Sequence, residues 1–137
     1  MQAKNDVMIA LDTNILARYL LNDSTTQADI AEKLIHGSET CTAPITVFLE
    51  LVWVLESCDC ERAEIAKSIR LLCGLENFKP QNLDALAYAL HWYEGGMDFG
   101  DALHLAMSAK ETGFKTFDKA FQKKAKELGV YPAVEAP

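Results

Sequence analysis

The chain has 137 residues, half of them hydrophobic, which suits one compact domain over residues 1–137 with a substantial core. Its net charge of −7 at pH 7 argues against a protein that coats nucleic acid non-specifically. No apolar run approaches the ~20 residues that span a bilayer, and the first six residues lack a signal-peptide pattern. Because the four cysteines match no zinc-ligand spacing, we expect reduced thiols in a cytoplasmic protein.

The first part of the chain alternates short apolar runs with segments whose hydrophobic residues recur at helical spacing. Val7–Leu11 is continuously apolar, which predicts a strand buried on both faces. The polar residues 22–26 predict a turn that also caps the next helix. In order, the predicted elements are a strand over Val7–Leu11, a helix that begins at Asp12–Asn14, a helix from the 22–26 turn to Gly37, a strand over Thr40–Ala43, and a helix that begins at Pro44 and carries Glu50.

The second part continues the same alternation. Leu103, Leu105, Ala106 and Ala109 are its candidate core residues, and Gly113 is expected to end their helix. The predicted elements are a helix over Glu61–Leu75, a brief strand at Phe78–Lys79, a helix from Asn82 through Tyr93, a helix over Asp98–Glu111, a strand over Lys115–Phe117, a helix over Asp118–Leu128 and a strand over Val130–Val134. Short strands alternating with helices favour an α/β fold with a mainly parallel sheet.

Five acidic residues lie at positions where we expect a carboxylate to be buried at a cost in free energy. They are Asp12, Glu50, Asp98, Asp101 and Asp118. Glu50, for example, is the only polar residue in the apolar stretch Val47–Leu55. A carboxylate buried without a partner costs several kcal/mol, so such groups are paired, protonated or bound to a cation. No run of Lys or Arg interleaves with these acids, so we expect a shared divalent metal at the carboxyl ends of the strands. That arrangement points to metal-dependent phosphoester chemistry.

Each acid also has a purely structural explanation, which the sequence leaves open. Asp12 and Asp118 follow predicted strands, where an Asp often caps the next helix. Glu50 alternatively reaches solvent or stays protonated. Asp98 suits an N-cap, with Asp101 in the first helical turn, where the helix dipole favours negative charge. We favour Asp101 as a metal ligand and Asp98 as a cap or auxiliary acid.

Other polar residues are candidates for supporting roles. Asn14 and Thr116 lie beside Asp12 and Asp118 and suit groups that hold a carboxylate or a water in place. His104 follows Asp101 by one helical turn. A lone histidine at such a position is more often a structural residue than a general base. Lysines at helical spacing and one arginine are candidate RNA-backbone contacts, although solvated Lys faces are common. These basic residues are Arg18, Lys119, Lys123 and Lys126.

Four short motifs, in order along nearly the whole chain, together resemble the PIN-domain family. They are Leu11-Asp12-Thr13-Asn14, Thr46-Val47-Phe48-Leu49-Glu50-Leu51, Asp98-Phe99-Gly100-Asp101-Ala102-Leu103-His104-Leu105-Ala106, and Thr116-Phe117-Asp118-Lys119-Ala120-Phe121. No single motif is specific, but four in this order are a strong signal. The small size of the chain resembles the VapC-type toxins of prokaryotic type II toxin–antitoxin pairs.

The resemblance implies a fold, an activity and partners. The fold is an α/β/α sandwich with a mainly parallel sheet of about five short strands. The activity is that of an endoribonuclease that cuts structured RNA with Mg²⁺ or Mn²⁺ held by Asp12 and Asp101. Glu50 and Asp118 would complete the acidic pocket. The implied partners are an RNA substrate, a cognate antitoxin and a second copy of the chain in a homodimer.

Rival functions differ in the residues that they require. A phosphatase with a nucleophilic aspartate favours an Asp-x-Asp signature, but the second position here is Asn14. A receiver-like signalling domain needs a phosphoacceptor aspartate after a middle strand, where this chain has Glu50 in a predicted helix. The remaining alternative is a non-catalytic PIN-like module that binds a partner through its first four helices and shows no metal-dependent cleavage.

Overall fold

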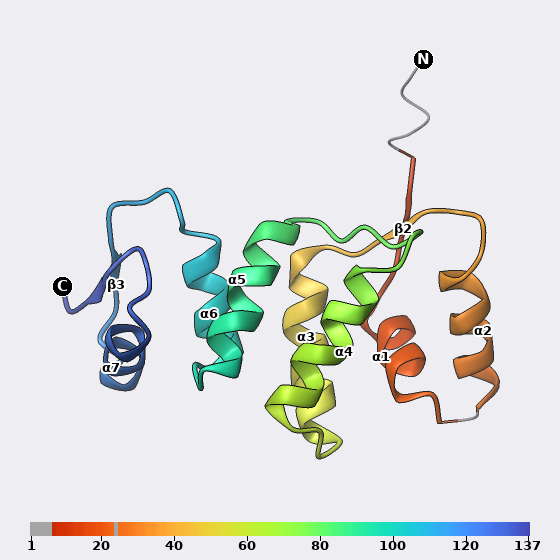
Figure 1. The fold of residues 1–137 in the computed structure, drawn as a ribbon, viewed down its shortest axis with the longest axis horizontal. Helices are drawn as coiled ribbons and strands as arrows, with labels where there is room; N and C mark the ends of the chain where they lie inside the picture. The colour runs from red at the N-terminus through yellow and green to blue at the C-terminus, as the bar shows by residue number, and fades with distance from the viewer. Residues whose placement is uncertain (1–6, 24) are drawn as a thin grey trace. The chain divides into compact units, whose positions relative to one another are not determined.

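The computed structural model describes residues 7–23 and 25–137, and its chain divides into two compact units, residues 1–83 and 84–137 (Figure 1). The expectation about a leader in residues 1–6, and the Ser24 position of the predicted turn, lie outside the described residues. The first unit contains β1 (Ile9–Ala10), α1 (Thr13–Leu21), α2 (Thr26–Ile35), β2 (Cys41–Thr42), α3 (Ile45–Ser57) and α4 (Arg62–Cys73). The second contains α5 (Leu83–Glu94) from its second residue on, α6 (Phe99–Ala106), β3 (Phe114–Lys115), α7 (Lys119–Leu128) and β4 (Val134–Glu135).

Parallel strand pairing in the first unit centres on β2. Cys41 of β2 pairs with Ile9 of β1 on one side and forms an isolated parallel bridge with Phe78 on the other. The predicted strand at Phe78–Lys79 is therefore present as this bridge. The expectation that Val7–Leu11 is buried on both faces is wrong, because Val7 is 77% exposed and lies beyond the paired residues.

The helices of the first unit begin where the sequence predicts them. The Asp12 carboxylate caps α1, and Thr25 caps α2 by accepting a 3.1 Å hydrogen bond from the Ala28 amide. Pro44 stands at the start of α3. In Figure 1, α1 lies between α2 and α3 and packs against both. The largest fully buried side chains of this unit are Leu16, Ile35, Phe48, Leu51, Ile65, Ile69, Leu72 and Phe78.

The second unit is built around α5, α6 and α7. Tyr93 of α5 meets Phe99 of α6 edge-on, with ring centroids 5.6 Å apart. Asp118 caps α7, which ends at Gly129 in a left-handed conformation with φ 63° that glycine adopts without steric cost. β3 and β4 pair in parallel, with Phe114 opposite Val134.

Helix α6 is shorter than predicted. It ends at Ala106, with Met107 as its C-cap, so Gly113 does not end it and Ala109 is exposed instead of buried. The Ser108 hydroxyl donates to the His104 carbonyl, and the Ser108 amide donates to the Leu105 carbonyl. These bonds satisfy carbonyl groups of the last turn and close the helix early.

The α/β character and the parallel pairing agree with the sequence prediction, but a single sheet of five strands is not shown. Within the described residues, the strands form two separate two-stranded parallel sheets. They are short because helix-starting residues follow at once, with Asp12 soon after β1 and Pro44 soon after β2. Among the described helices, none has the length and apolar character needed to cross a membrane.

The four cysteines are free thiols, as the sequence predicts. Burial raises the pKa of Cys73 to about 11, which keeps this thiol protonated at neutral pH. Burial also raises the pKa of Cys41 and Cys60. Only Cys58 is fully exposed among them.

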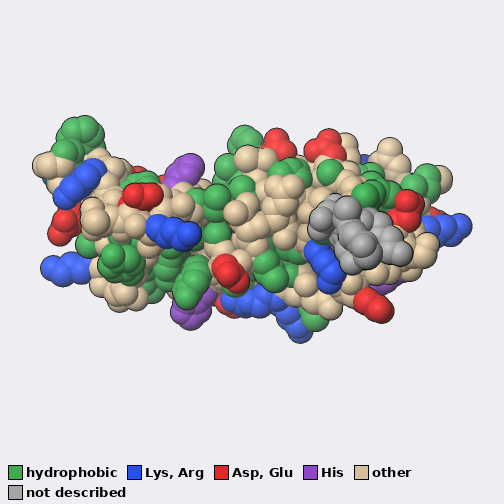
Figure 2. All heavy atoms as spheres, turned by 90° about the horizontal axis from the view of Figure 1, so that it is seen from above, with side chains coloured by type: hydrophobic (Ala, Val, Ile, Leu, Met, Phe, Trp, Pro, Cys, Tyr) green, Lys and Arg blue, Asp and Glu red, His purple; other side chains and the backbone are tan. Residues whose placement is uncertain are grey.

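Charged side chains of both signs are interspersed with hydrophobic ones on the face that Figure 2 shows. This pattern differs from the broad basic surface of proteins that coat nucleic acid. Together with the net charge of −7, this face offers an anionic substrate local basic residues and no general positive field.

Candidate functional site

The first unit holds two of the predicted acids in one pocket. Asp12 accepts a 2.7 Å hydrogen bond from the Thr13 amide through Oδ1, and the Thr13 hydroxyl donates a 2.7 Å hydrogen bond to Glu50 Oε1. Thr13 therefore connects the start of α1 to α3 across 37 residues of sequence. Asp12, Thr13, Asn14, Glu50 and Trp53 all line a pocket of about 690 Å³.

The second unit brings the other three acids together. Asp98 Oδ2 accepts a 3.0 Å hydrogen bond from the Asp101 amide, so Asp98 is the N-cap of α6. Burial raises the pKa of Asp101, and the negative charges of Asp98 and Asp118 raise it further, whereas His104 lowers it. The Asp101 carboxylate thus lies close enough to two other acids for their negative charges to disfavour its ionised form.

The sequence led us to expect that these five acids are buried, and this expectation is wrong for four of them. Asp12, Glu50, Asp98 and Asp118 are exposed, and only Asp101 is partly buried. The prediction failed because an apolar stretch in a helix has one solvent-facing side, and Glu50 lies there between exposed Leu49 and Trp53. The cost of burying charge therefore does not by itself require a cation, but the repulsion at Asp101 remains.

The acids differ in how their oxygen atoms are engaged. Asp12, Asp98 and Asp118 each use one carboxylate oxygen as a helix cap. In the described parts of the chain, no donor holds the carboxylate of Asp101, whose pKa responds to burial and neighbouring charges without a hydrogen bond. A partly buried carboxylate crowded by like charges is a group whose energy a bound cation lowers.

The donor chemistry of these residues fits a hard divalent cation. Carboxylate oxygens are the ligands that Mg²⁺ prefers, and Mg²⁺ sites often use only one or two protein carboxylates. Among residues 7–23 and 25–137, no three His, Cys, Asp or Glu side chains are arranged as a metal site. The fit therefore concerns only the type of ligand atom that these acids offer.

The supporting residues predicted from the sequence have several different environments. Asn14 is exposed in the pocket with Asp12. The Thr116 hydroxyl accepts a 3.0 Å hydrogen bond from the Asp118 amide, so it supports the Asp118 backbone instead of its carboxylate. His104 is exposed and acts on Asp101 through its charge.

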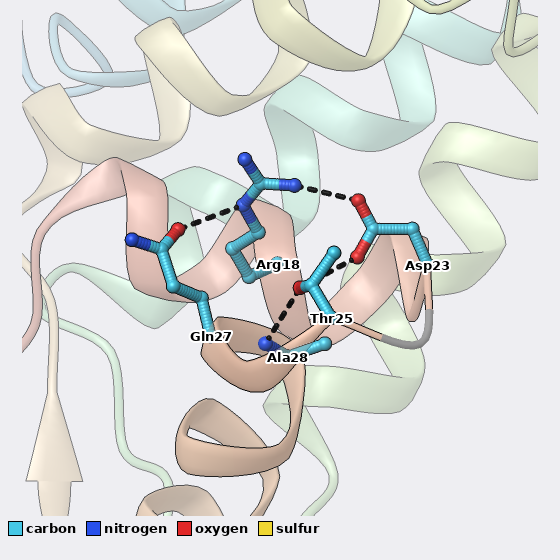
Figure 3. A network of polar contacts seen from close by, with 5 residues as sticks. All are labelled: Arg18, Asp23, Thr25, Gln27 and Ala28. Carbon is cyan, nitrogen blue, oxygen red and sulfur yellow. Dashed lines mark hydrogen bonds and ion pairs between the residues drawn. The ribbon is translucent and has the colours of Figure 1, made fainter.

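The basic candidates also differ. Figure 3 shows that the Arg18 guanidinium contacts Asp23 and Gln27, which places its charge in a local network beside the Thr25 cap. Lys119, Lys123 and Lys126 are exposed and line one groove along α7. The lysine face predicted from helical spacing therefore exists, whereas Arg18 is already engaged.

Sequence reasoning missed Thr13 as the residue that orients Glu50. Its position beside Asp12 was visible, but its contact with Glu50 depends on how α1 packs against α3. Trp53 was also missed as a pocket residue, although its 73% exposure is unusual for so large an apolar side chain.

For the metal-dependent cleavage that the acids lead us to expect, replacing Thr13 with alanine should lower the rate by roughly 10- to 100-fold, as is typical when a group that orients a site carboxylate is lost. The reason is that Glu50 Oε1 loses its 2.7 Å hydroxyl donor. Thr13→Ser keeps the hydroxyl and is the matched control. Equal activity of the alanine and serine variants in a metal-dependent cleavage assay would contradict this role for Thr13.

A comparison with known protein families gives one match, and it covers most of the chain. The family model described as PIN domain matches residues 9–127, which includes all five acids and both units. Of the curated proteins compared with the chain, none matches it. PIN domains are generally metal-dependent nucleases that usually use divalent metals such as Mg²⁺. On the strength of this match and of the acids that it contains, the chain belongs to the PIN-domain family.

Proposed function

We propose that the protein is a metal-dependent endoribonuclease and the toxin of a toxin–antitoxin pair. The observation that carries the nuclease proposal is the Asp101 carboxylate, crowded by Asp98 and Asp118 within a chain of a nuclease family. Crowded carboxylates weaken the folded state, so their retention at one place favours a role in binding a cation.

The proposal assigns Mg²⁺ or Mn²⁺ to Asp12 and Asp101, with Glu50 and Asp118 as further acids of the reaction. This assignment of ligands rests on the four family-like motifs and on carboxylate chemistry. When bound, a divalent ion supplies an acidified water for attack on the phosphodiester and offsets the charge that develops on the phosphate oxygens.

The residues of the chain then have distinct tasks. Thr13 fixes Glu50 through its hydroxyl, while its amide fixes one oxygen of Asp12. Both carboxylates line the same pocket, and these two bonds leave the second oxygen of each carboxylate unused. Asp98 holds the first turn of α6 through the Asp101 amide and so orients Asp101. This hydrolysis uses no nucleophilic side chain.

The substrate and partners follow from the same proposal. The substrate is structured RNA, with Lys119 and Lys123 contacting its backbone from the exposed face of α7. A cognate antitoxin would block the acids, a homodimer would be the working form, and the cytoplasm would be the site of action. The support for these four points is the resemblance to VapC-type toxins.

The decisive test is cleavage of total RNA by the purified protein with Mn²⁺ and with excess chelator. We expect cleavage only with metal, and products with a 5′-phosphate, because water attacks the phosphodiester directly. A 2′,3′-cyclic phosphate product, or full activity in chelator, would contradict the proposed chemistry. Complete absence of cleavage, together with binding of a protein partner, would favour the non-catalytic alternative.

The assignment of one ion to Asp12 and Asp101 needs a separate measurement. Fe²⁺ bound in place of Mg²⁺ generates radicals with ascorbate and peroxide, and these cut the backbone beside the ion. We expect cuts near both residue 12 and residue 101, which mass spectrometry identifies. Cuts near only one of the two would refute the shared ligand set while leaving the nuclease activity to be judged by the RNA assay.

A further inference from the structure

Two adjoining grooves in the second unit lie outside the group of acids. The first, of about 710 Å³, runs along α7 and β4 and is lined by Lys119, Lys123 and Lys126. The second, of about 400 Å³, is lined by Tyr88, Trp92 and Tyr131. Both grooves include Gly129 and Val130 in their walls, so the basic groove borders the aromatic one.

The aromatic groove is lined by two exposed tyrosines and a partly buried tryptophan. Tyr88 is 59% exposed and Tyr131 is 66% exposed, which is high for such large side chains in a folded domain. Tyr88 and Trp92 lie one turn apart on α5, with ring centroids 5.8 Å apart and ring planes inclined by 32°. Exposed aromatic side chains that line a groove are groups on which further flat rings can stack.

The wall of the lysine groove contains more basic than acidic side chains. Glu135 is the only acid in its wall among the described residues, and it is paired with Lys115 at 3.2 Å. Glu127 is paired with Lys124 at 3.0 Å. Lys119, Lys123 and Lys126 are exposed on a chain whose total charge is −7, so this groove is a local exception.

We propose that the two grooves form a single binding track for unpaired RNA, in which the lysines contact phosphates and the aromatic side chains stack on bases. A basic groove joined to aromatic platforms is the arrangement by which proteins bind single strands without reading their sequence. The inference deepens the proposed function, on which it rests, by defining the substrate as an unpaired loop or end of a structured RNA.

The test measures binding with cleavage disabled. The full-length protein carries Asp101→Asn, and a fluorescent unstructured oligoribonucleotide reports affinity by anisotropy in chelator. Tyr131→Ala and Trp92→Ala are each expected to weaken binding by about 5- to 150-fold, the loss of one stacked base. Because Trp92 is partly buried, Trp92→Phe is added and is expected to retain binding. Tyr131 is more exposed, so its variant tests the proposal without loss of folding.

An abasic oligonucleotide and a salt series separate the two parts of the track. On abasic RNA the aromatic variants are expected to bind like the parent, since no base is there to stack. Lys123→Ala is expected to weaken binding to both oligonucleotides and to reduce the slope of log K against log salt by about 0.7. Lys110→Ala, an exposed lysine outside both grooves, is the matched control and leaves affinity unchanged.

Several outcomes would overturn this inference. One is unchanged affinity of the Tyr131 and Trp92 variants, and another is an equal loss on abasic RNA. A third is displacement of the RNA by an acidic peptide whose own binding is weakened by Tyr131→Ala. That result would identify a peptide-docking surface. If the groove variants bind RNA more weakly but the wild-type protein cleaves no RNA, the proposed nuclease activity is refuted and the binding track is not. If the wild-type protein cleaves RNA but the groove variants bind it normally, the binding track is refuted and the nuclease activity is not.

Discussion

Replacing Asp101 with asparagine is expected to abolish RNA cleavage and to make the metal-free fold more stable at neutral pH. The loss of activity should be roughly 10²–10³-fold or more, because a metal ligand, the role that we propose for Asp101, contributes several kcal/mol to the transition state. The gain in stability follows from Asp101's raised pKa, which has burial as its largest cause and the charges of Asp98 and Asp118 next.

The pH dependence of this effect has a definite sign. A carboxyl whose pKa is higher in the folded state than in the unfolded state binds its proton more tightly when folded. Its contribution to stability is therefore greatest in acid and declines as pH rises from the unfolded pKa through the folded pKa. We expect the wild type to lose this contribution over that interval, and Asp101→Asn to lack the decline.

The measurement is urea unfolding in chelator between about pH 3 and 7, beside cleavage assays in Mn²⁺. Asp84→Asn is the matched control, because Asp84 is also an acid in a first helical turn but is exposed. It should lose a little stability through the helix dipole and keep full activity. A less stable Asp101→Asn protein at neutral pH would contradict the repulsion that we describe at this site.

Replacing Phe48 with alanine is expected to lower the free energy of unfolding by about 3–5 kcal/mol. Phe48 is fully buried in the first unit and meets Phe78 edge-on, with ring centroids 6.3 Å apart. A loss of this size is a large part of the ~5–15 kcal/mol that stabilises a typical domain. Phe48 lies on α3, the helix that also carries Glu50. Because unfolding of α3 displaces Glu50, we expect RNA cleavage to fall in proportion to the folded fraction.

The neighbouring residue provides a control for this prediction. Leu49 lies on the same helix but is 38% exposed, so Leu49→Ala should cost much less than Phe48→Ala. Urea midpoints of the two variants give the comparison. Similar losses for both would contradict the role that we assign to the buried contact of Phe48, because alanine favours the helix at either position.

The helix starts could be predicted from sequence because each depends on a few adjacent residues. Asp12, Thr25 and Asp118 cap the helices that follow them, as their residue types and positions indicate. The same locality explains the prediction of Pro44 at the start of α3. Capping is a local interaction, and it needs no knowledge of the rest of the fold.

Burial and long-range contacts could not be predicted in the same way. Ala109 fits the helical spacing of a core residue, but α6 ends three residues earlier and leaves it exposed. The link between Thr13 and Glu50 depends on how α1 and α3 pack. The exposure of Glu50 likewise depends on which side of α3 faces the core, because its apolar stretch has no clear polar face.

Three of the five acids also begin helices, and this has a consequence for how the protein tolerates change. Asp12, Asp98 and Asp118 each accept an amide proton at a helix start, so their loss disturbs both local folding and chemistry. Asparagine accepts the same proton without the charge, whereas alanine does not. Descendants of this chain that abandon catalysis should therefore drift toward asparagine at these positions, leaving the architecture intact after the activity is gone.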